Sequence, residues 1–307
     1  PYMPKAVQGV LDLRSWNFAE EPIIRLDGEW MLLPYRFLYD AATDESNVSP
    51  EYVKVPGGWD HLIHTDDGRL PFGYGTYRLV ILMPEGTQGS YAMKSQLVRT
   101  AHAMYVNGRL IGQSGTPGRD QTTTKPSTMP NYGQFELSGD RVIVEIQASN
   151  FHYAKLGGMF RSVQFGLEDD LHRRDHLKSI SETLFGGLFI VCGVYFCCLY
   201  FIRKRNLELL YFGLFFLFYL FYWFTHGEKL LFYWLPQISY ELQSKIQGLS
   251  SVYIHGAIVL FVHAVYPQLT RRIMLRISSI IVAGLTLFFI VTEVSVYSRF
   301  ELIYVSL

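Results

Sequence analysis

The chain has 307 residues, of which 49% are apolar and 18% are charged, and its 27 Lys/Arg balance its 27 Asp/Glu. This length suits about two domains, and the balanced charge excludes a basic nucleic-acid-binding protein and a highly charged disordered chain. The balance hides a division, because residues 1–176 hold 17 Lys/Arg and 21 Asp/Glu, a net charge of −4, whereas residues 177–307 hold 10 and 6, a net charge of +4. We interpret the two parts as a water-soluble domain followed by a membrane domain.

Short β-rich runs, separated by Gly/Pro turns, fill the first part of the chain. The strongest runs are 77–83, 103–106, 109–112, 141–149 and 161–167. Asn107-Gly108 joins two of them and supplies the positive φ angles of a hairpin turn. No window before about residue 170 shows a helical period. The pattern predicts an all-β sandwich or jelly roll over 1–168, held by an apolar core because this part has no cysteine.

Apolar segments long enough to cross a bilayer dominate the second part. Residues 169–179 are interpreted as a juxtamembrane connector that begins the first helix, and 180–307 as the membrane domain. A helical span takes about 20 residues. The predicted spans are 184–202, 209–225, 247–266 and 277–292, and 300–307 looks like the start of a fifth. Cys192, Cys197 and Cys198 lie in the first span and are interpreted as small apolar residues, not metal ligands.

Basic loops set the predicted orientation. Residues 203–205 and 271–276 each carry three basic residues, whereas Lys229 and Lys245 in the intervening loop are offset by glutamates. Basic loops stay in the cytoplasm, so the N-terminal domain is expected outside, in the extracellular space or periplasm. No signal peptide is recognisable at the start, and four spans alone would leave no cytoplasmic C-terminus. We therefore expect the sequence to be a piece of a longer protein.

Few polar side chains lie within the predicted spans. Glu182 and Glu293 lie at span edges, where we expect them to reach headgroups or water. His255 lies well inside its span and is the better candidate for a polar contact between helices. Trp223, Tyr233 and Trp234 are interpreted as an aromatic belt at the outer membrane interface.

Two resemblances are carried by motifs. Five motifs occur in the order seen in the sugar-binding domain of glycoside hydrolase family 2, which resembles a galactose-binding jelly roll. They are Leu26-Asp27-Gly28-Glu29-Trp30, Val55-Pro56-Gly57-Gly58-Trp59, Gly73-Tyr74-Gly75-Thr76-Tyr77-Arg78, Val106-Asn107-Gly108 and Gly157-Gly158-Met159-Phe160-Arg161. These are mostly turn and core motifs, so the resemblance implies the fold and does not establish a sugar ligand.

The whole chain resembles the bacterial seven-transmembrane receptors with diverse intracellular signalling modules. The run from Gly9 to Trp16, the motifs above, the run from Ser149 to His152, and the first span with its basic loop at 199–206 carry this resemblance. It implies an outer jelly-roll domain, seven helices and a cytoplasmic output module such as a kinase, cyclase or phosphatase. The present chain departs from the family by ending near a fifth span without an output module.

Polar and aromatic residues in the turns of the first part are candidates for a ligand site, since ligand contacts concentrate on loops. The candidate ligand-binding residues are Trp59, Asp60, His61, Tyr74, Asn150, His152 and Lys155. For Trp16, Trp30 and Trp59 a place in the core is the alternative to stacking on a sugar ring. Asn150 alternatively ties down loop backbone. His61 and His64 with Asp66 and Asp67 could bind a divalent metal, but a solvated loop is the preferred interpretation.

No catalytic motif, phosphate loop or metal-binding motif is recognisable, so we expect no catalytic residues, cofactor or metal, and no enzyme activity in this chain. The expected function is that of a receptor that binds an extracellular small molecule or carbohydrate and signals through the bilayer to a cytoplasmic module in cis. A homodimer would be one means of relay, and the sequence does not show it. The alternatives are a transporter or membrane enzyme with a carbohydrate-binding accessory domain, and a structural cell-surface domain.

Overall fold

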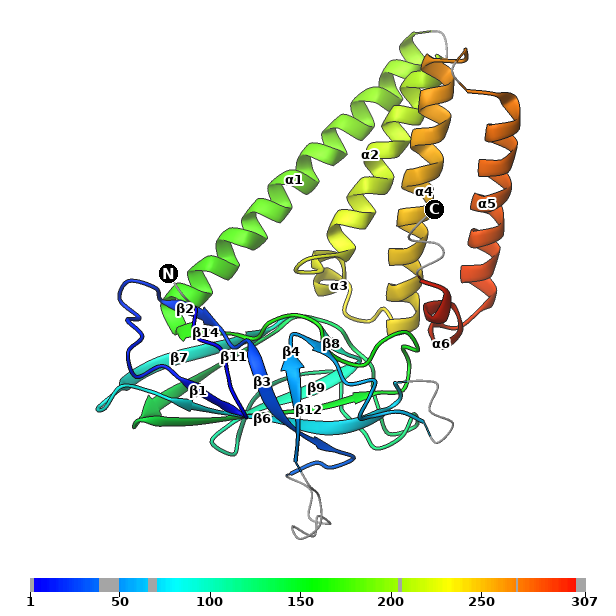
Figure 1. Ribbon diagram of the computed structural model, residues 1–307. Helices are drawn as coiled ribbons and strands as arrows, with labels where there is room; N and C mark the ends of the chain where they lie inside the picture. Colours follow the sequence, from blue (N-terminus) through cyan, green and yellow to red (C-terminus); the bar gives the residue numbers. More distant parts are fainter. Residues whose placement is uncertain (1–2, 39–49, 66–70, 204–205, 269, 302–307) are drawn as a thin grey trace. The chain divides into compact units, whose positions relative to one another are not determined.

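The computed structural model describes residues 3–38, 50–65, 71–203, 206–268 and 270–301. The chain divides into two compact units, Pro1–Asp175 and His176–Leu307. The first is built of β-strands and the second of α-helices (Figure 1). Each is described by itself below.

Three sheets make up the first unit. The largest has the order β10 (Arg109–Ser114), β9 (Ala101–Val106), β12 (Arg141–Asn150), β6 (Gly73–Leu82), β3 (Gly28–Pro34) and β4 (Glu51–Val55), with β1 (Val10–Asp12) parallel to β6. The second has the order β11 (Asn131–Ser138), β7 (Gln88–Ser95), β14 (Gln164–Leu167) and β2 (Ile23–Arg25). A small third sheet joins β5 (Gly57–Gly58), β13 (Gly158–Met159) and β8 (Val98–Arg99).

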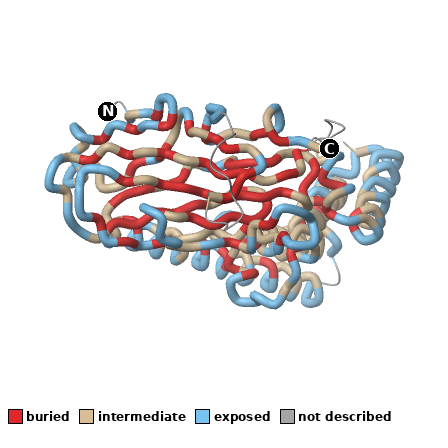
Figure 2. Tube along the Cα trace, turned by 90° about the horizontal axis from the view of Figure 1, so that it is seen from below, coloured by how far each residue is buried: buried red, intermediate tan, exposed pale blue. Residues whose placement is uncertain are grey.

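The apolar core fills the space between the two large sheets. Every second residue of β12 from Val142 to Ala148 is completely buried, as its alternation predicts. Trp30 is also fully buried, and its Nε1 donates to the Leu26 carbonyl over 2.9 Å. Figure 2 shows the buried residues running along the strands and the exposed residues gathering in the turns. The predicted β-sandwich is therefore confirmed, and Trp30 takes the core place that was its alternative.

The Asn107-Gly108 hairpin is also confirmed. Arg109 pairs with Val106 across the turn, and φ is 48° at Asn107 and 81° at Gly108. A two-residue turn of this kind needs positive φ at both positions. The turn therefore sets the register of β9 and β10 as the sequence predicts.

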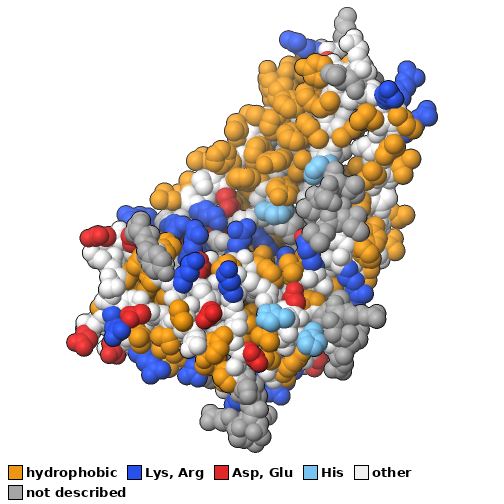
Figure 3. Space-filling model, in the orientation of Figure 1, with side chains coloured by type: hydrophobic (Ala, Val, Ile, Leu, Met, Phe, Trp, Pro, Cys, Tyr) orange, Lys and Arg blue, Asp and Glu red, His pale blue; other side chains and the backbone are white. Residues whose placement is uncertain are grey.

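Among the described residues, four helices of the second unit are long and apolar enough to span a membrane. They are α1 (Glu168–Ile202), α2 (Leu207–Thr225), α4 (Tyr240–Val265) and α5 (Arg272–Val291). Only 6–17% of their most apolar windows is buried inside the protein, and hydrophobic side chains cover the helices in Figure 3. A surface of this kind is stable in lipid and not in water. The described part also contains α3 (Leu230–Trp234), α6 (Val294–Tyr297) and a 3₁₀ turn, Ser298–Phe300.

Small residues let α1 and α2 approach closely. A Cβ on Gly186 would clash with the Phe224 ring, and one on Gly193 would lie 2.6 Å from Leu217. Phe196 of α1 meets Phe212 of α2 edge to face at 4.7 Å. Close backbone approach at small residues is how helices gain van der Waals contact in lipid, where apolar burial supplies no driving force.

Residues 169–179 form the beginning of the first helix, since α1 runs unbroken from Glu168. Two details differ from the sequence expectations. Glu182 is only 8% exposed, so it does not reach freely into water from the helical unit. His255 is exposed, and its Nδ1 bonds to the Ser251 carbonyl of its own helix at 2.7 Å, not to another helix. Most of the expected fifth span, 302–307, lies outside the described residues.

Candidate functional site

Three loops meet at the small sheet of the sandwich, which we call the rim. It comprises β5 with the turn after it, β8, and the loop 150–158. Gly158 pairs with Gly58 on one side and with Arg99 on the other. The rim holds six of the seven predicted ligand-binding residues and is the candidate ligand site. They are Trp59, Asp60, His61, Asn150, His152 and Lys155.

Trp59 is a core residue that packs against the rim. Its side chain is completely buried and stacks on Tyr77 with ring centroids 5.9 Å apart. Its Nε1 donates to the Pro71 carbonyl over 3.3 Å. Trp59 therefore presents no ring face to a ligand, and the alternative core interpretation describes it correctly.

Asn150 is the polar centre of the loop that follows β12. It is completely buried. Its Nδ2 donates to the carbonyls of Tyr153 over 2.8 Å and Pro71 over 3.1 Å, and its Oδ1 accepts from the Tyr153 N–H over 3.1 Å. A buried amide with its donors and acceptor engaged in this way has no capacity left for a ligand. Asn150 therefore shapes the rim through bonds within the protein.

Asp60 lies on the open side of the rim. The residue is exposed, but its Oδ1 accepts from the Gly157 N–H over 3.0 Å. Partial burial raises the pKa of this carboxyl, and the Gly157 hydrogen bond and the charge of His61 oppose that rise. His61 is exposed beside it. Asp60 is therefore a fixed acceptor.

Arg99 is the rim residue that the sequence did not single out. Its guanidinium lies over the Tyr153 ring, 3.5 Å from the centroid, and Tyr153 is 6% exposed. The Arg99 Nε is buried without a hydrogen-bond acceptor in the described part of the chain. Nothing in the run around Arg99 distinguishes it, because only the pairing of β8 with β13 brings it to the site.

The remaining candidates are partly or wholly open. His152 and Lys155 are partly exposed on the loop between Asn150 and Gly158, and both make contacts within the protein. Tyr74 of β6 pairs with Ser149, the residue before Asn150, and its ring packs against Phe37 at 4.9 Å and Tyr35 at 6.0 Å. His64 is exposed, and its N–H donates to the Tyr35 hydroxyl over 3.0 Å.

Metal ligands do not gather in the described residues, where no group of three or more His, Cys, Asp or Glu is placed to hold an ion. The metal interpretation of the turn after Trp59 also involved Asp66 and Asp67. These two residues lie outside the described ranges.

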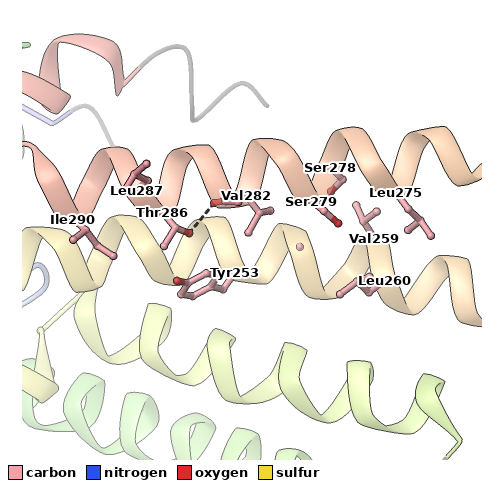
Figure 4. Close-up of a pocket in the computed structure, with 12 residues that line it drawn as sticks. Tyr253, Val259, Leu260, Leu275, Ser278, Ser279, Val282, Thr286, Leu287 and Ile290 are labelled. Carbon is pink, nitrogen blue, oxygen red and sulfur yellow. Dashed lines mark hydrogen bonds between the residues drawn. The ribbon is translucent and has the colours of Figure 1, made fainter.

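A pocket lies in the helical unit between α4 and α5 (Figure 4). Its volume is about 470 Å³, and its lining is mostly apolar, with hydroxyls from Tyr253, Ser278, Ser279 and Thr286. Thr286 donates to the Val282 carbonyl of its own helix over 2.7 Å. With so few polar groups directed into it, the hollow offers shape but little chemistry for recognition.

The start of α1 is tied to the sandwich. Helix α1 begins at the residue after β14, with no loop between them. Leu171 is completely buried. Lys94 of β7, with a side chain 3% exposed, pairs with Asp175 at 3.0 Å, and Ser90 of β7 donates to the Glu168 carboxylate. The first two turns of α1 therefore belong to the first unit.

A second set of charged side chains connects the next turns of α1 to the rest of the helical unit. Lys178 pairs with Glu228 at 2.6 Å and lies 4.0 Å from Glu182. Glu182 in turn accepts from the Glu228 N–H over 3.2 Å, and its carbonyl accepts from Trp223 Nε1 over 3.1 Å. Asp175 and Lys178 are three residues apart and so lie on neighbouring positions of one helix face. Ion pairs of α1 thus occur in both units, with Asp175 in the first and Lys178 in the second.

Comparison with known proteins identifies the helical part. Residues 178–307 match the family described as 7TM diverse intracellular signalling. The helical part of the chain is therefore similar to the membrane domain of this family, as the motifs predict. No curated protein matches the chain.

Solved structures with a similar arrangement of strands are glycoside hydrolase family 2 enzymes. A β-galacturonidase from Eisenbergiella tayi is 14% identical, with 47% of this chain and 24% of that chain covered and a TM-score of 0.34. A β-glucuronidase from Ruminococcus gnavus is also 14% identical, with 47% and 29% covered and a TM-score of 0.35. The match spans less than a third of either enzyme, and at these TM-scores it carries no argument about function.

Proposed function

We propose that this chain is the sensory and membrane part of a bacterial receptor. The sandwich binds a small molecule or carbohydrate at the rim on the outer side of the membrane. The bound state alters the packing of α1, and the helices convey the change to a cytoplasmic output module. The receptor class follows from the family of the helical part, and the ligand and its transmission are the proposal.

The observation that carries the proposal is the double attachment of α1. Its first two turns are bound to β7 by Lys94–Asp175, and its following turn is bound to the helical unit by Lys178–Glu228. A movement of β14 acts directly on the first turn of α1, because α1 begins at the residue after β14. A ligand shifts such an equilibrium only by its differential affinity for the two states, and a 10-fold preference corresponds to about 1.4 kcal/mol.

The test is thermal unfolding of the full chain in lipid nanodiscs against a panel of monosaccharides, sugar acids and amino acids. We expect at least one compound to raise the melting temperature, because a ligand that binds only the folded state stabilises it. A panel that leaves the melting temperature unchanged at millimolar concentration would contradict ligand sensing by this domain.

Transmission is tested in the same samples by hydrogen exchange. Binding at the rim should change the exchange rates of amides in 176–186 of α1, beyond the loops that contact the ligand. Protection confined to the rim would support binding and contradict the proposed route through α1.

A further inference from the structure

We propose that Arg99 makes the rim a site for a carboxylate-bearing small molecule, such as a sugar acid. This inference rests on the proposed function and goes beyond it by naming the chemical class of the ligand. Its basis is an arginine without an ion-pair partner among the described residues, and a fixed acceptor, Asp60, beside the same small sheet.

The orientation of the Arg99 guanidinium suits a planar anion. The Tyr153 ring supports one face of the guanidinium at 3.5 Å, which fixes the plane of the N–H groups. Arg99 forms no ion pair with a carboxylate among the residues that the structure describes. The side chain is partly exposed, while its Nε is buried without an acceptor.

The Arg99 side chain is partly exposed and pairs with no carboxylate among the described residues, so an anion that reaches it is favoured. A carboxylate offers two coplanar oxygens, which match the parallel N–H groups of a guanidinium. A neutral sugar hydroxyl satisfies at most one of these donors and brings no opposite charge. The geometry therefore favours a carboxylate over a hydroxyl at Arg99.

Asp60 supplies the complementary group. Strand β5, which ends two residues before Asp60, and β8, which contains Arg99, both pair with β13. A Cβ on Gly58 would lie 3.4 Å from both carboxylate oxygens of Asp60, so the Asp60 carboxylate is held against β5. The outer strands of three neighbours are about 10 Å apart. A ligand with a carboxylate at one end and hydroxyl donors at the other fits these two groups.

The test uses the full chain in nanodiscs and measures binding by calorimetry. The probes are D-glucuronate and D-galacturonate, their neutral parents D-glucose and D-galactose, and inorganic sulfate. We expect a sugar acid to bind at least 10-fold more tightly than its parent and than sulfate. Arg99→Lys keeps the charge but loses the planar fork, and should lower the affinity for the acid by 10-fold or more while leaving the affinity for the neutral sugar unchanged.

Arg109→Lys, on the Asn-Gly hairpin, is the matched control and should bind every probe as the native chain does. Arg99→Lys must first show the native melting temperature without ligand. A second readout is the ¹⁵N–¹H resonance of the Arg99 Nε, identified by its absence in Arg99→Lys, which should shift on addition of the acid.

The outcomes separate the two proposals. Neutral sugars that bind as tightly as their acids, acid binding unaffected in Arg99→Lys, or sulfate binding as tightly as the acids would each overturn the carboxylate site and leave ligand sensing intact. An Arg99 Nε resonance unmoved by a bound acid would also overturn it. Failure of every compound in the wider panel to bind would overturn both.

Discussion

Asn150 shows how a single polar side chain organises the rim. Its amide engages the backbone at Pro71 and Tyr153, which lie on two different loops. The Nε1 of Trp59 donates a second hydrogen bond to the Pro71 carbonyl. The rim geometry thus depends on residues that a ligand never touches.

We expect Asn150→Ala to loosen the loop 150–158. Buried groups left without partners cost about 1–3 kcal/mol, so hydrogen exchange in this loop should rise by about 5-fold or more. Asn17→Ala is the control, because Asn17 makes an exposed bond to the Ala19 N–H, and it should leave exchange at the rim unchanged. Native exchange rates in Asn150→Ala would show that the amide is dispensable.

His102 joins the two large sheets through the core. It is 1% exposed, and its Nε2 shares a hydrogen bond of 2.6 Å with the hydroxyl of Ser95. Burial lowers the pKa of His102 to about 4, against about 6.5 in the unfolded chain. Between these values the unfolded chain binds a proton that the folded protein does not, so the folded state loses stability as the pH falls.

The free energy of unfolding should therefore drop by about 3 kcal/mol between pH 6.5 and pH 4 through this residue. Denaturant titrations of the full chain in nanodiscs, followed by tryptophan fluorescence, measure the drop. His102→Gln should remove most of it, whereas His61→Gln, at an exposed position, should not. Equal pH dependence in the native chain and His102→Gln would refute this assignment.

At the scale of elements, the α1–α2 interface depends on a glycine facing an aromatic ring. A Cβ on Gly186 would clash with Phe224, whereas one on Gly187 meets nothing within 4 Å. We expect Gly186→Val to destabilise the helical unit by about 1–3 kcal/mol through overpacking, and Gly187→Val to have little effect. Unfolding of both variants in detergent measures this, and equal stability of the two would contradict the observed packing.

The link between β7 and α1 is testable in the same manner. Removing the charge of Asp175 leaves Lys94 buried with less compensation, and breaking a buried pair in this way costs about 3 kcal/mol. Asp175→Asn should therefore weaken ligand-dependent changes in α1 and lower the melting temperature. Asp170→Asn is the control, since its partner Arg173 has a side chain 74% exposed, and such a pair contributes little.

At the scale of the whole molecule, the charge division predicts the orientation in the membrane. A fluorescent reporter fused after Arg205 should be active in the cytoplasm, and a phosphatase fused after Gln237 should be active outside, because the basic loops stay inside. Reporters with the opposite activities would reverse the orientation and place the rim in the cytoplasm, contrary to the proposed sensing of an external ligand.

Sequence alone determined the two-part fold. The alternation in 141–149 and the Asn107-Gly108 turn predict strands that the structure contains, and the uncharged runs predict four membrane-length helices. These signals are local, since period and turn chemistry act between near neighbours. The motifs of the sequence also predicted the resemblance to the receptor family whose description matches residues 178–307.

Only the tertiary structure decided the details of the candidate site. Trp59 and Asn150 look like surface residues in the sequence, but contacts to Tyr77 and Pro71 bury them. Arg99 carries no local signal and joins the rim through pairing with a strand almost 60 residues away. Glu182 is buried because the backbone of Glu228 and the charge of Lys178 offset the cost of its burial. Long-range pairing brings such groups together, and composition and period do not encode it.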